Sequence, residues 1–261
     1  MPLLPGFEGE PESSSTLQII LRHTYDGICR NHRLRVIEQL YKIMGNNWKE
    51  YIGFYSLRNH GIVNNIPKTK IIYIHSKLMI VDDTKVWIGS ANINDSTMLG
   101  ERDSEFAVLI KEKKELINRI NGRNFIMNGN DNYHAAYFAV SFRKALMAEH
   151  LGINKDDPIL DDPVSSQLHD FIMNRARVNT RIYQTIFTCY PDDIILNFSL
   201  LEKVKKFKQR EKPEELLNKY IKLKDQIIGY IVEFPLRFLK EEKLGAVLFS
   251  KESLVPEITF T

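Results

Sequence analysis

The chain has 261 residues, of which 43% are hydrophobic and 26% are charged, so it is long and apolar enough to bury a sizeable core. Its formal net charge of +3 is too balanced to demand nucleic acid, and we expect no nucleic-acid partner. Its two cysteines, Cys29 and Cys189, lie far apart in the sequence, which favours reduced thiols in a cytosolic compartment over a disulfide framework.

The N-terminus lacks the pattern of a secretory signal, and no uncharged apolar run reaches the roughly 18 residues of a membrane span. We therefore expect a cytoplasmic protein that meets any bilayer from the water side. Residues 6–15 are rich in Gly, Pro, Ser and Glu, which indicates a linker.

The first regular elements follow this linker. An apolar-periodic segment from Thr16, with Ser15 as its N-cap, predicts a helix. Residues 34–44 continue helically, and Gly45 is placed to end that helix. Residues 51–57 alternate between apolar and polar and predict a strand.

The most informative pattern comes next. It reads His75-Ser-Lys77, four residues, Asp82, six residues, Gly89-Ser90-Ala91-Asn92. Residues 70–75, 77–82 and 85–89 are rich in β-branched and apolar residues, and residues 83–84 are compatible with a turn. We expect strands joined by a turn.

Strand alternation places His75 and Lys77 on one face, whereas Asp82 leans to the other, where it would brace or orient. A returning hairpin is expected to bring Ser90 and Asn92 alongside the first two. A lone His-x-Lys is common on solvated strand edges. The added Gly-Ser-x-Asn makes chance roughly three orders of magnitude less probable.

These side chains suit phosphoryl transfer. A histidine with a pKa near neutrality attacks phosphorus or carries a proton to the leaving oxygen. Lys77 supplies positive charge for non-bridging oxygens, and Ser90 and Asn92 add donors. This inventory requires no metal, because the span holds a single His, no Cys and no carboxylates at metal-loop spacing.

A further strand is predicted at residues 105–110, after a loop at residues 98–104. The carboxylate of Glu105, at the start of that strand, is expected to accept a hydrogen bond from a ring nitrogen of His75 and to fix its tautomer. Asp103 is a rival for this role.

The rest of the chain is predominantly helical. Helical spacing predicts helices at residues 133–151 and 163–186 and another from Pro213, and residues 229–239 predict a short strand interrupted at Pro235. Residues 203–212 are strongly basic. They form either a solvated surface or a patch for anionic lipid.

The pattern His75-x-Lys77-x4-Asp82-x6-Gly89-Ser90-x-Asn92 is similar to the HKD motif of the phospholipase D superfamily. Residues 89–105 look like the second of the two motifs in eukaryotic phospholipase D. The resemblance also covers residues 2–9, which look like the inter-motif segment, residues 54–60, which look like the strand before the second motif, and residues 255–261, which look like the C-terminus. Ser96 departs from it, because many relatives carry Arg there.

The resemblance implies an α/β fold, with a mixed β-sheet flanked by helices, that forms one lobe of a bilobal enzyme. Residues 1–15 would be an inter-motif linker segment, and residues 16–261 would be the C-terminal phospholipase D catalytic lobe. The implied reaction is hydrolysis of phosphatidylcholine to phosphatidic acid and choline, or transphosphatidylation, through a phosphohistidine intermediate. The implied catalytic residues are His75, Lys77, Asp82 and Glu105, and the implied phosphate-binding residues are Lys77, Ser90 and Asn92.

The implied partners are a phospholipid membrane surface, an N-terminal HKD lobe and small GTPase regulators. The resemblance implies phosphoinositide activation, but no cofactor is required for the chemistry. The protein would lie in the cytoplasm, peripherally on membranes. The apolar tail, residues 255–261, is expected to dock near the active site, where its free carboxylate would matter.

The sequence contains one His-x-Lys motif, whereas two-step phosphodiester chemistry needs a nucleophile and a separate acid or base on opposite sides of phosphorus. We therefore expect half of an active site, in a chain that begins between the two motifs of a longer enzyme. Two alternatives remain. One is a homodimeric HKD phosphodiesterase or nuclease, and the other is a lobe that binds lipid or a partner without turnover.

Overall fold

The structure, a computed structural model, describes residues 1–6, 10–29, 35–100, 102–112, 116–117, 119–120, 123–124 and 133–245. These residues form helices and small antiparallel sheets, which confirms the predicted α/β class. They divide into two compact units. The first unit holds Met1–Ile74, Thr180–Gln226 and the described residues from Glu233 onward, and the second holds His75–Asn179 and Ile227–Val232.

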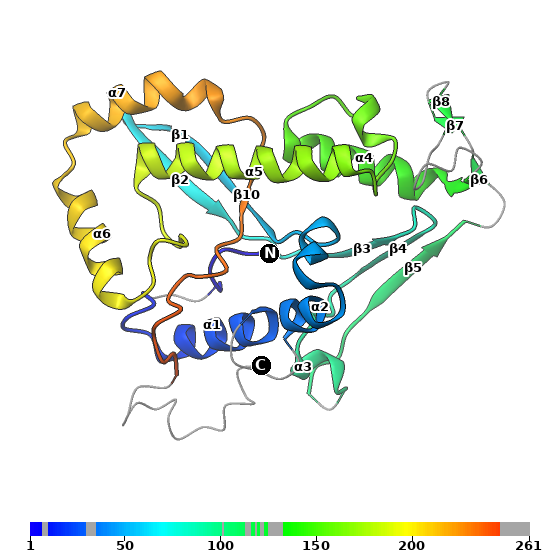
Figure 1. The fold of residues 1–261 in the computed structure, drawn as a ribbon, viewed down its shortest axis with the longest axis horizontal. Coiled ribbons are helices and arrows are strands. Elements are labelled where there is room, and N and C mark those ends of the chain that lie inside the picture. Colours follow the sequence, from blue (N-terminus) through cyan, green and yellow to red (C-terminus); the bar gives the residue numbers. More distant parts are fainter. Residues whose placement is uncertain are drawn as a thin grey trace. The chain divides into compact units, whose positions relative to one another are not determined.

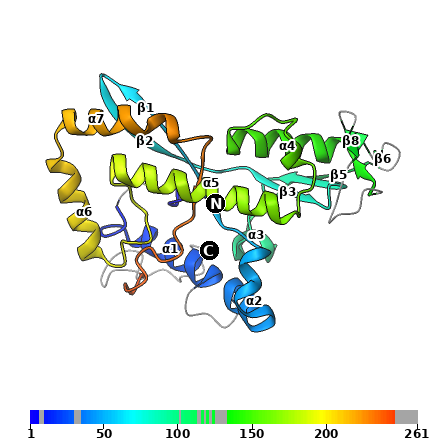
Figure 2. The ribbon, with the colours of Figure 1, turned by 45° about the horizontal axis from the view of Figure 1, so that its top comes forward.

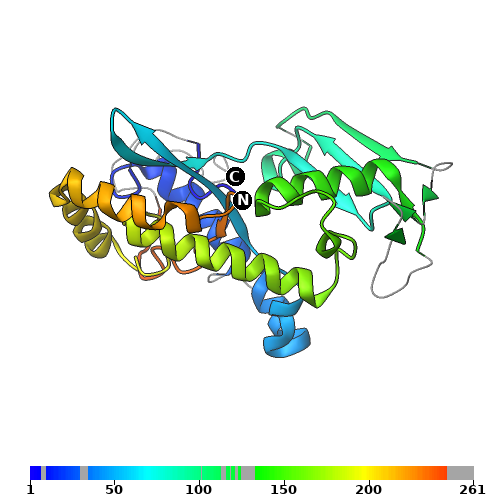
Figure 3. The same cartoon turned by 90° about the horizontal axis from the view of Figure 1, so that it is seen from above.

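The second unit is built on a three-stranded antiparallel sheet in the order β3-β4-β5. Its strands are β3 (Lys77–Val81), β4 (Lys85–Gly89) and β5 (Ala107–Lys111), close to the predicted positions. Figures 1 and 3 show α4 (Tyr137–Leu151) lying against this sheet. The strands form here because short runs of consecutive β-branched and apolar residues favour extended backbone.

The register explains how this sheet packs. Ile80 pairs with Val86, and Val86 pairs with Ile110, so these three side chains share one face. They pack with Ala136, Ala139 and the aromatic side chains of α4. On the opposite face, Met79 is 55% exposed and Leu109 is 60% exposed.

The second unit contains further short elements. They are α3 (Asp95–Met98), the strand pair β6 (Leu116–Ile117) and β9 (Ala135–Ala136), the strand pair β7 (Arg119–Ile120) and β8 (Arg123–Asn124), and the 3-10 helix η2 (Pro158–Leu160). Gly152 ends α4 with a φ of 65°, in the left-handed conformation that glycine favours at helix C-termini. The long helix α5 (Ser166–Phe187) contributes residues to both units.

The first unit begins with α1 (Ser15–Ile28). Its N-cap is Ser14, whose hydroxyl accepts a hydrogen bond from the Leu17 amide, so the prediction of Ser15 was wrong by one residue. Next come α2 (Val36–Met44) and the 3-10 helix η1 (Gly45–Glu50). Gly45 adopts a φ of 60° and ends α2, as predicted.

A β-hairpin follows in the first unit, formed by β1 (Tyr55–Val63) and β2 (Ile66–Ile72). Asn64 and Asn65 have φ values of 51° and 61°, and Val63 pairs with Ile66, as in a two-residue hairpin turn. The predicted strands at residues 51–57 and 70–75 were therefore misplaced. Their apolar content was recognised, but the Asn-Asn turn that joins them was missed.

The remaining elements of the chain are α6 (Phe198–Arg210), α7 (Pro213–Leu223), the 3-10 helix η3 (Lys224–Gln226) and β10 (Ile231–Glu233). Figure 2 shows α6 and α7 as consecutive helices in yellow and orange. A core of Tyr25, Leu201, Phe234 and Phe238 joins α1, α6 and the segment after β10. The basic run, residues 203–212, lies mainly on α6.

Among the described helices, none combines the length and the apolar character that crossing a bilayer requires. The expectation for the tail, residues 255–261, concerns residues outside those that the structure describes.

Candidate active site

Five of the six predicted site residues, all but Asp82, gather at one end of the β3-β4-β5 sheet. The register pairs Lys77 with Gly89 and Gly89 with Ala107. The start of β3, the end of β4 and the start of β5 therefore lie at the same end of the sheet. His75 lies just before β3, Ser90 and Asn92 follow β4, and Glu105 lies just before β5. Antiparallel pairing thus brings residues that are up to thirty positions apart in the sequence to one end of the sheet.

β4 and β5 approach each other closely at Gly89. A Cβ atom on Gly89 would lie 2.6 Å from the Phe106 carbonyl oxygen and 2.7 Å from the Ala107 Cβ. Only a residue without a side chain allows β5 to approach β4 this closely. The glycine of the Gly-Ser-x-Asn pattern therefore has a packing role.

Ser90 joins the ends of β4 and β5. Its amide donates to the Phe106 carbonyl at 2.9 Å, and its hydroxyl oxygen accepts from the Phe106 amide at 3.1 Å. The same hydroxyl donates to a carboxylate oxygen of Glu105. The seryl side chain is thus held in place at the strand ends.

Glu105 is held by a second hydroxyl. Thr97 Oγ1 donates to Glu105 Oε1 at 3.0 Å and accepts from the Asn92 amide at 3.4 Å. The network connects Glu105 to both Ser90 and Asn92, the two predicted phosphate donors. Thr97 was missed by the sequence analysis, because nothing in its spacing distinguishes it from an ordinary helix residue.

Asp103, the rival of Glu105, makes a different contact. Its carboxylate accepts from the Ser96 hydroxyl, and its amide donates to the Ser96 carbonyl at 3.3 Å. Ser96 is the position where the sequence departs from the motif of many relatives. Asp103 thus closes the loop that follows α3, and Glu105 is the carboxylate that contacts Ser90. The pairing of either carboxylate with His75 stays a prediction.

His75 and Lys77 lie at the open end of β3. His75 is exposed, whereas Lys77 is partly buried and donates from Nζ to the His75 carbonyl oxygen at 2.8 Å. The lysine ammonium is therefore held next to the histidine backbone. Ser90 does not lie directly opposite Lys77. The residue that pairs with Lys77 is Gly89, and β4 ends at Gly89. Ser90 lies one residue beyond the paired part of β4, so strand alternation does not determine where its side chain points.

Asp82 lies at the other end of the hairpin, in the turn between β3 and β4. Its side chain is exposed, and its backbone carbonyl accepts from the Tyr133 hydroxyl at 2.7 Å. Desolvation and the nearby carboxylates of Asp82 and Asp83 raise the pKa of the Tyr133 hydroxyl, which favours its donor form. The role predicted for the Asp82 carboxylate stays a prediction.

Asp83 is the carboxylate that anchors the hairpin turn, and the sequence analysis missed it. Its side chain is 1% exposed, and both oxygens accept from Arg143 Nε on α4 at 2.9 Å. Its carbonyl accepts from the Ala136 amide at 2.8 Å. Two adjacent aspartates in a turn look alike in a sequence, and only the packing of α4 shows which one is buried.

At this end of the sheet, four of the predicted residues are exposed, namely His75, Ser90, Asn92 and Glu105. An imidazole, an ammonium, a hydroxyl and an amide at an open end of a sheet can hold an anionic phosphate and move one proton. The described part of the chain thus presents the inventory of a phosphodiester-cleaving site at a solvent-facing end of the sheet.

Comparison with known proteins agrees with this inventory. A family profile described as "Phospholipase D" matches residues 1–198. The chain is 38% identical over 271 residues to phospholipase D1 of Homo sapiens, with 100% of the chain and 24% of the relative aligned. It is 37% identical over 266 residues to phospholipase D2 of Bos taurus, with 98% and 27% aligned. It is 34% identical over 277 residues to phospholipase D zeta 1 of Arabidopsis thaliana, with 97% and 24% aligned.

The chain belongs to the phospholipase D family. It spans about a quarter of the length of these curated relatives, for example 27% of the bovine protein and 24% of the human one.

Proposed function

We propose that this chain supplies one half of the active site of a phospholipase D that hydrolyses phosphatidylcholine to phosphatidic acid and choline, or transfers the phosphatidyl group to another alcohol. The observation that carries the proposal is the gathering of His75, Lys77, Ser90 and Asn92 at one exposed end of the β3-β4-β5 sheet. Membership of the family supports it.

The chemistry proceeds in two displacements at phosphorus. In the first, a histidine of a second HKD motif attacks phosphorus, the bond to the choline oxygen breaks, and His75 gives its proton to that oxygen. In the second, His75 takes a proton from water, and the resulting hydroxide attacks phosphorus, which breaks the bond to the other histidine and releases phosphatidic acid. Lys77, Ser90 and Asn92 hold the non-bridging oxygens as negative charge builds. Asp82 and Glu105 fix the geometry.

The second motif comes from another lobe. The sequence has one His-x-Lys, and one imidazole cannot act on both sides of phosphorus. The exposed apolar side chains Met79 and Leu109, on the sheet face opposite α4, support a protein partner for this unit. The partner is an N-terminal HKD lobe, on the same longer chain or on a second subunit.

The proposed substrate and the family resemblance indicate where the protein acts. Phosphatidylcholine resides in a bilayer, so the proposal places the protein in the cytoplasm, peripherally on a membrane. By resemblance to the family, phosphoinositides would activate it and small GTPases would regulate it, while the chemistry itself requires no cofactor.

The test is choline release from phosphatidylcholine vesicles by the purified chain, alone and mixed with a lobe that carries the other HKD motif. Activity is expected only on mixing. Turnover by the chain alone at about 1 per second or more would contradict the proposal. Sedimentation of the chain alone then decides whether a homodimer is responsible, and nuclease and phosphodiester substrates test the homodimeric alternative. Binding without turnover in the mixture would leave only a lipid- or partner-binding lobe.

A further inference from the structure

The basic run at residues 203–212 folds mainly as the second half of α6, and the helix separates its charges into two sets. Leu201 is buried in the core of the first unit, and Val204 packs against that core. Residues three and four apart share a helix face, so the face opposite these two carries Lys203, Lys206, Phe207 and Arg210. All four are exposed. We call them the outer face of α6.

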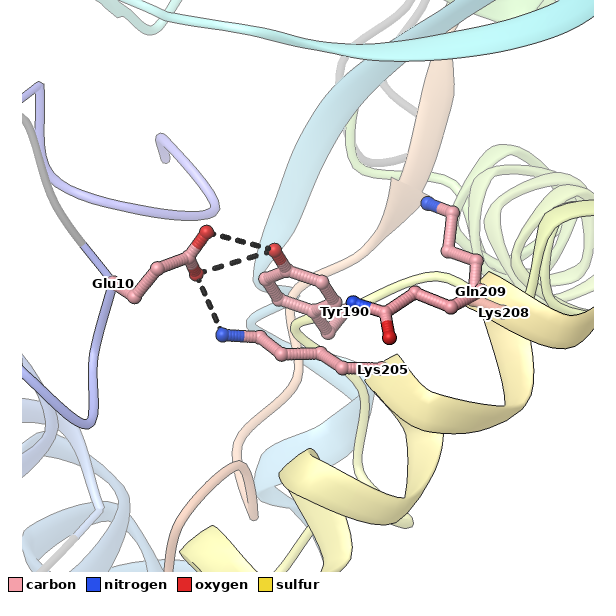
Figure 4. A pocket seen from close by; sticks show the side chains of 5 residues that line it. All are labelled: Glu10, Tyr190, Lys205, Lys208 and Gln209. Atoms are coloured by element: carbon pink, nitrogen blue, oxygen red, sulfur yellow. Dashed lines mark hydrogen bonds and ion pairs between the residues drawn. The ribbon is translucent and has the colours of Figure 1, made fainter.

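Lys205 belongs to the other set. Its ammonium lies 2.8 Å from a carboxylate oxygen of Glu10, pairs with Glu12, and sits 5.2 Å from the centre of the Tyr190 ring. Figure 4 shows the side chains of Glu10, Tyr190 and Lys205 converging, with the Tyr190 hydroxyl also directed at Glu10. Lys205 therefore ties the N-terminal segment to α6. Its charge is satisfied within the protein, so it is not part of the outer face.

The outer face combines cations with an exposed aromatic ring. Phe207 is 57% exposed, between three cationic side chains on the same face. Lys206 pairs with Glu202, but both of these side chains are at least 60% exposed, so solvent weakens the pair. Basic side chains together with an exposed aromatic ring supply the two attractions by which helices bind membrane surfaces, namely charge and apolar contact.

We propose that the outer face of α6, formed by Lys203, Lys206, Phe207 and Arg210, docks on the surface of an anionic phospholipid bilayer. The cations are attracted by the negative surface potential, and Phe207 enters the boundary between headgroups and acyl chains. The choice of a lipid surface rests on the proposed function. The four residues lie outside the candidate active site, so docking and turnover are separable.

The observations favour a bilayer over nucleic acid or an acidic protein. These charges form a stripe along one helix, on side chains that are all exposed. A stripe of this kind matches a diffuse plane of charge. The overall charge of +3 is modest, so attraction to any polyanion comes mainly from local clusters.

The test measures co-sedimentation of the full chain with vesicles of phosphatidylcholine alone and of phosphatidylcholine with about 30% phosphatidylserine. Binding is expected only to the anionic vesicles, and it should weaken between about 0.1 M and about 0.5 M salt because the charges are exposed. Each basic residue near such a surface strengthens binding about fivefold. The triple variant Lys203→Gln, Lys206→Gln, Arg210→Gln should therefore bind on the order of 100-fold more weakly.

Two further variants sharpen the result. Lys68→Gln, Lys70→Gln, Lys155→Gln removes three exposed lysines elsewhere and changes the net charge equally, so it should bind within about twofold of the unaltered chain. Phe207→Ala should weaken binding about tenfold with little change in its salt dependence, because it removes apolar contact alone. Thermal unfolding of each variant confirms that the fold is retained.

Three results would overturn the proposal. The first is a control triple that loses as much affinity as the α6 triple. The second is equal binding to neutral and anionic vesicles. The third is binding of a short single-stranded RNA that is tighter than vesicle binding and is lost with the α6 triple, which would assign the surface to nucleic acid. Because no turnover is measured, failure here leaves the proposed reaction intact, and failure of choline release leaves this surface intact.

Discussion

Arg143 Nε lies 2.9 Å from both carboxylate oxygens of Asp83, and the two side chains are 9% and 1% exposed. Arg143 also donates from Nη1 to the Leu160 carbonyl at 2.9 Å. Asp83 stands in the β3-β4 turn, and the open ends of the same hairpin carry Lys77 and Gly89. The pair thus attaches the hairpin that presents the candidate site to α4.

Asp83→Asn is expected to lower the free energy of unfolding by about 3–5 kcal/mol, because it leaves the Arg143 charge buried without its partner. The matched control is Asp82→Asn, whose side chain is exposed and which should change the free energy by no more than about 0.5 kcal/mol. Both positions have a φ near 50°, which Asn tolerates, so backbone strain does not separate them. Urea unfolding measures both, and equal losses would refute the anchoring role.

Gly89→Ala should destabilise the second unit by about 1–3 kcal/mol, because the added Cβ would lie 2.6 Å from the Phe106 carbonyl oxygen. Gly61→Ala is the control, since a Cβ there meets nothing within 4 Å. Denaturant unfolding and hydrogen exchange at the amides of Ser90 and Phe106 give the comparison. If Gly61→Ala costs as much as Gly89→Ala, close packing of β5 is not the reason for the glycine.

Glu105→Gln removes the charge that accepts hydrogen bonds from Ser90 and Thr97. In the enzyme reconstituted with a second HKD lobe, we expect kcat to fall by about 10-fold. This loss is smaller than that expected for His75→Asn, because Glu105 orients other groups of the site and does not itself transfer a proton. Asp103→Asn, which alters the Ser96 contact instead, should leave kcat within about threefold. The opposite order would transfer the orienting role to Asp103.

His60 predicts a pH dependence of stability in the first unit. Its Nδ1 lies 3.1 Å from the Tyr220 hydroxyl of α7, and burial, with Lys224 adding repulsion and Asp225 opposing it, lowers the pKa of the imidazole. The unfolded chain therefore binds a proton more readily. The stabilising contribution is complete above the unfolded pKa of about 6.5 and is lost as pH falls from there through the folded pKa.

Urea midpoints measured between about pH 5 and pH 8 test this prediction. His60→Gln should flatten the loss of stability on the acid side. Some dependence should remain, because burial also lowers the pKa of His150. An unchanged slope in His60→Gln would show that the imidazole is not the group responsible.

The sequence predicted the strands around the motif well, because the β-branched and apolar content of residues 77–81 and 85–89 is local information. It misplaced the β1-β2 hairpin, where Asn64 and Asn65 supply the turn through their positive φ values. It predicted a strand at residues 229–239, of which only Ile231–Glu233 pairs as β10, since Pro235 offers no amide donor.

At the candidate site, the sequence identified the residues at the strand ends but not the bonds between them. The contact of Glu105 with Ser90 depends on the β4-β5 register, and the burial of Asp83 depends on the distant helix α4. Neither is encoded in the spacing of the motif. Contacts that depend on tertiary packing can be identified only in the folded structure.

The most direct test of the central claim, that His75 is the acid and base of the reaction, uses a phosphatidyl ester of p-nitrophenol. This leaving group needs no protonation, so the first displacement no longer requires the acid. In the enzyme reconstituted with a second HKD lobe, His75→Asn should release p-nitrophenol in a burst, accumulate phosphohistidine on the other lobe, and lose at least about 100-fold in steady-state turnover of phosphatidylcholine. Normal turnover of phosphatidylcholine by His75→Asn, or loss of the burst itself, would contradict the account.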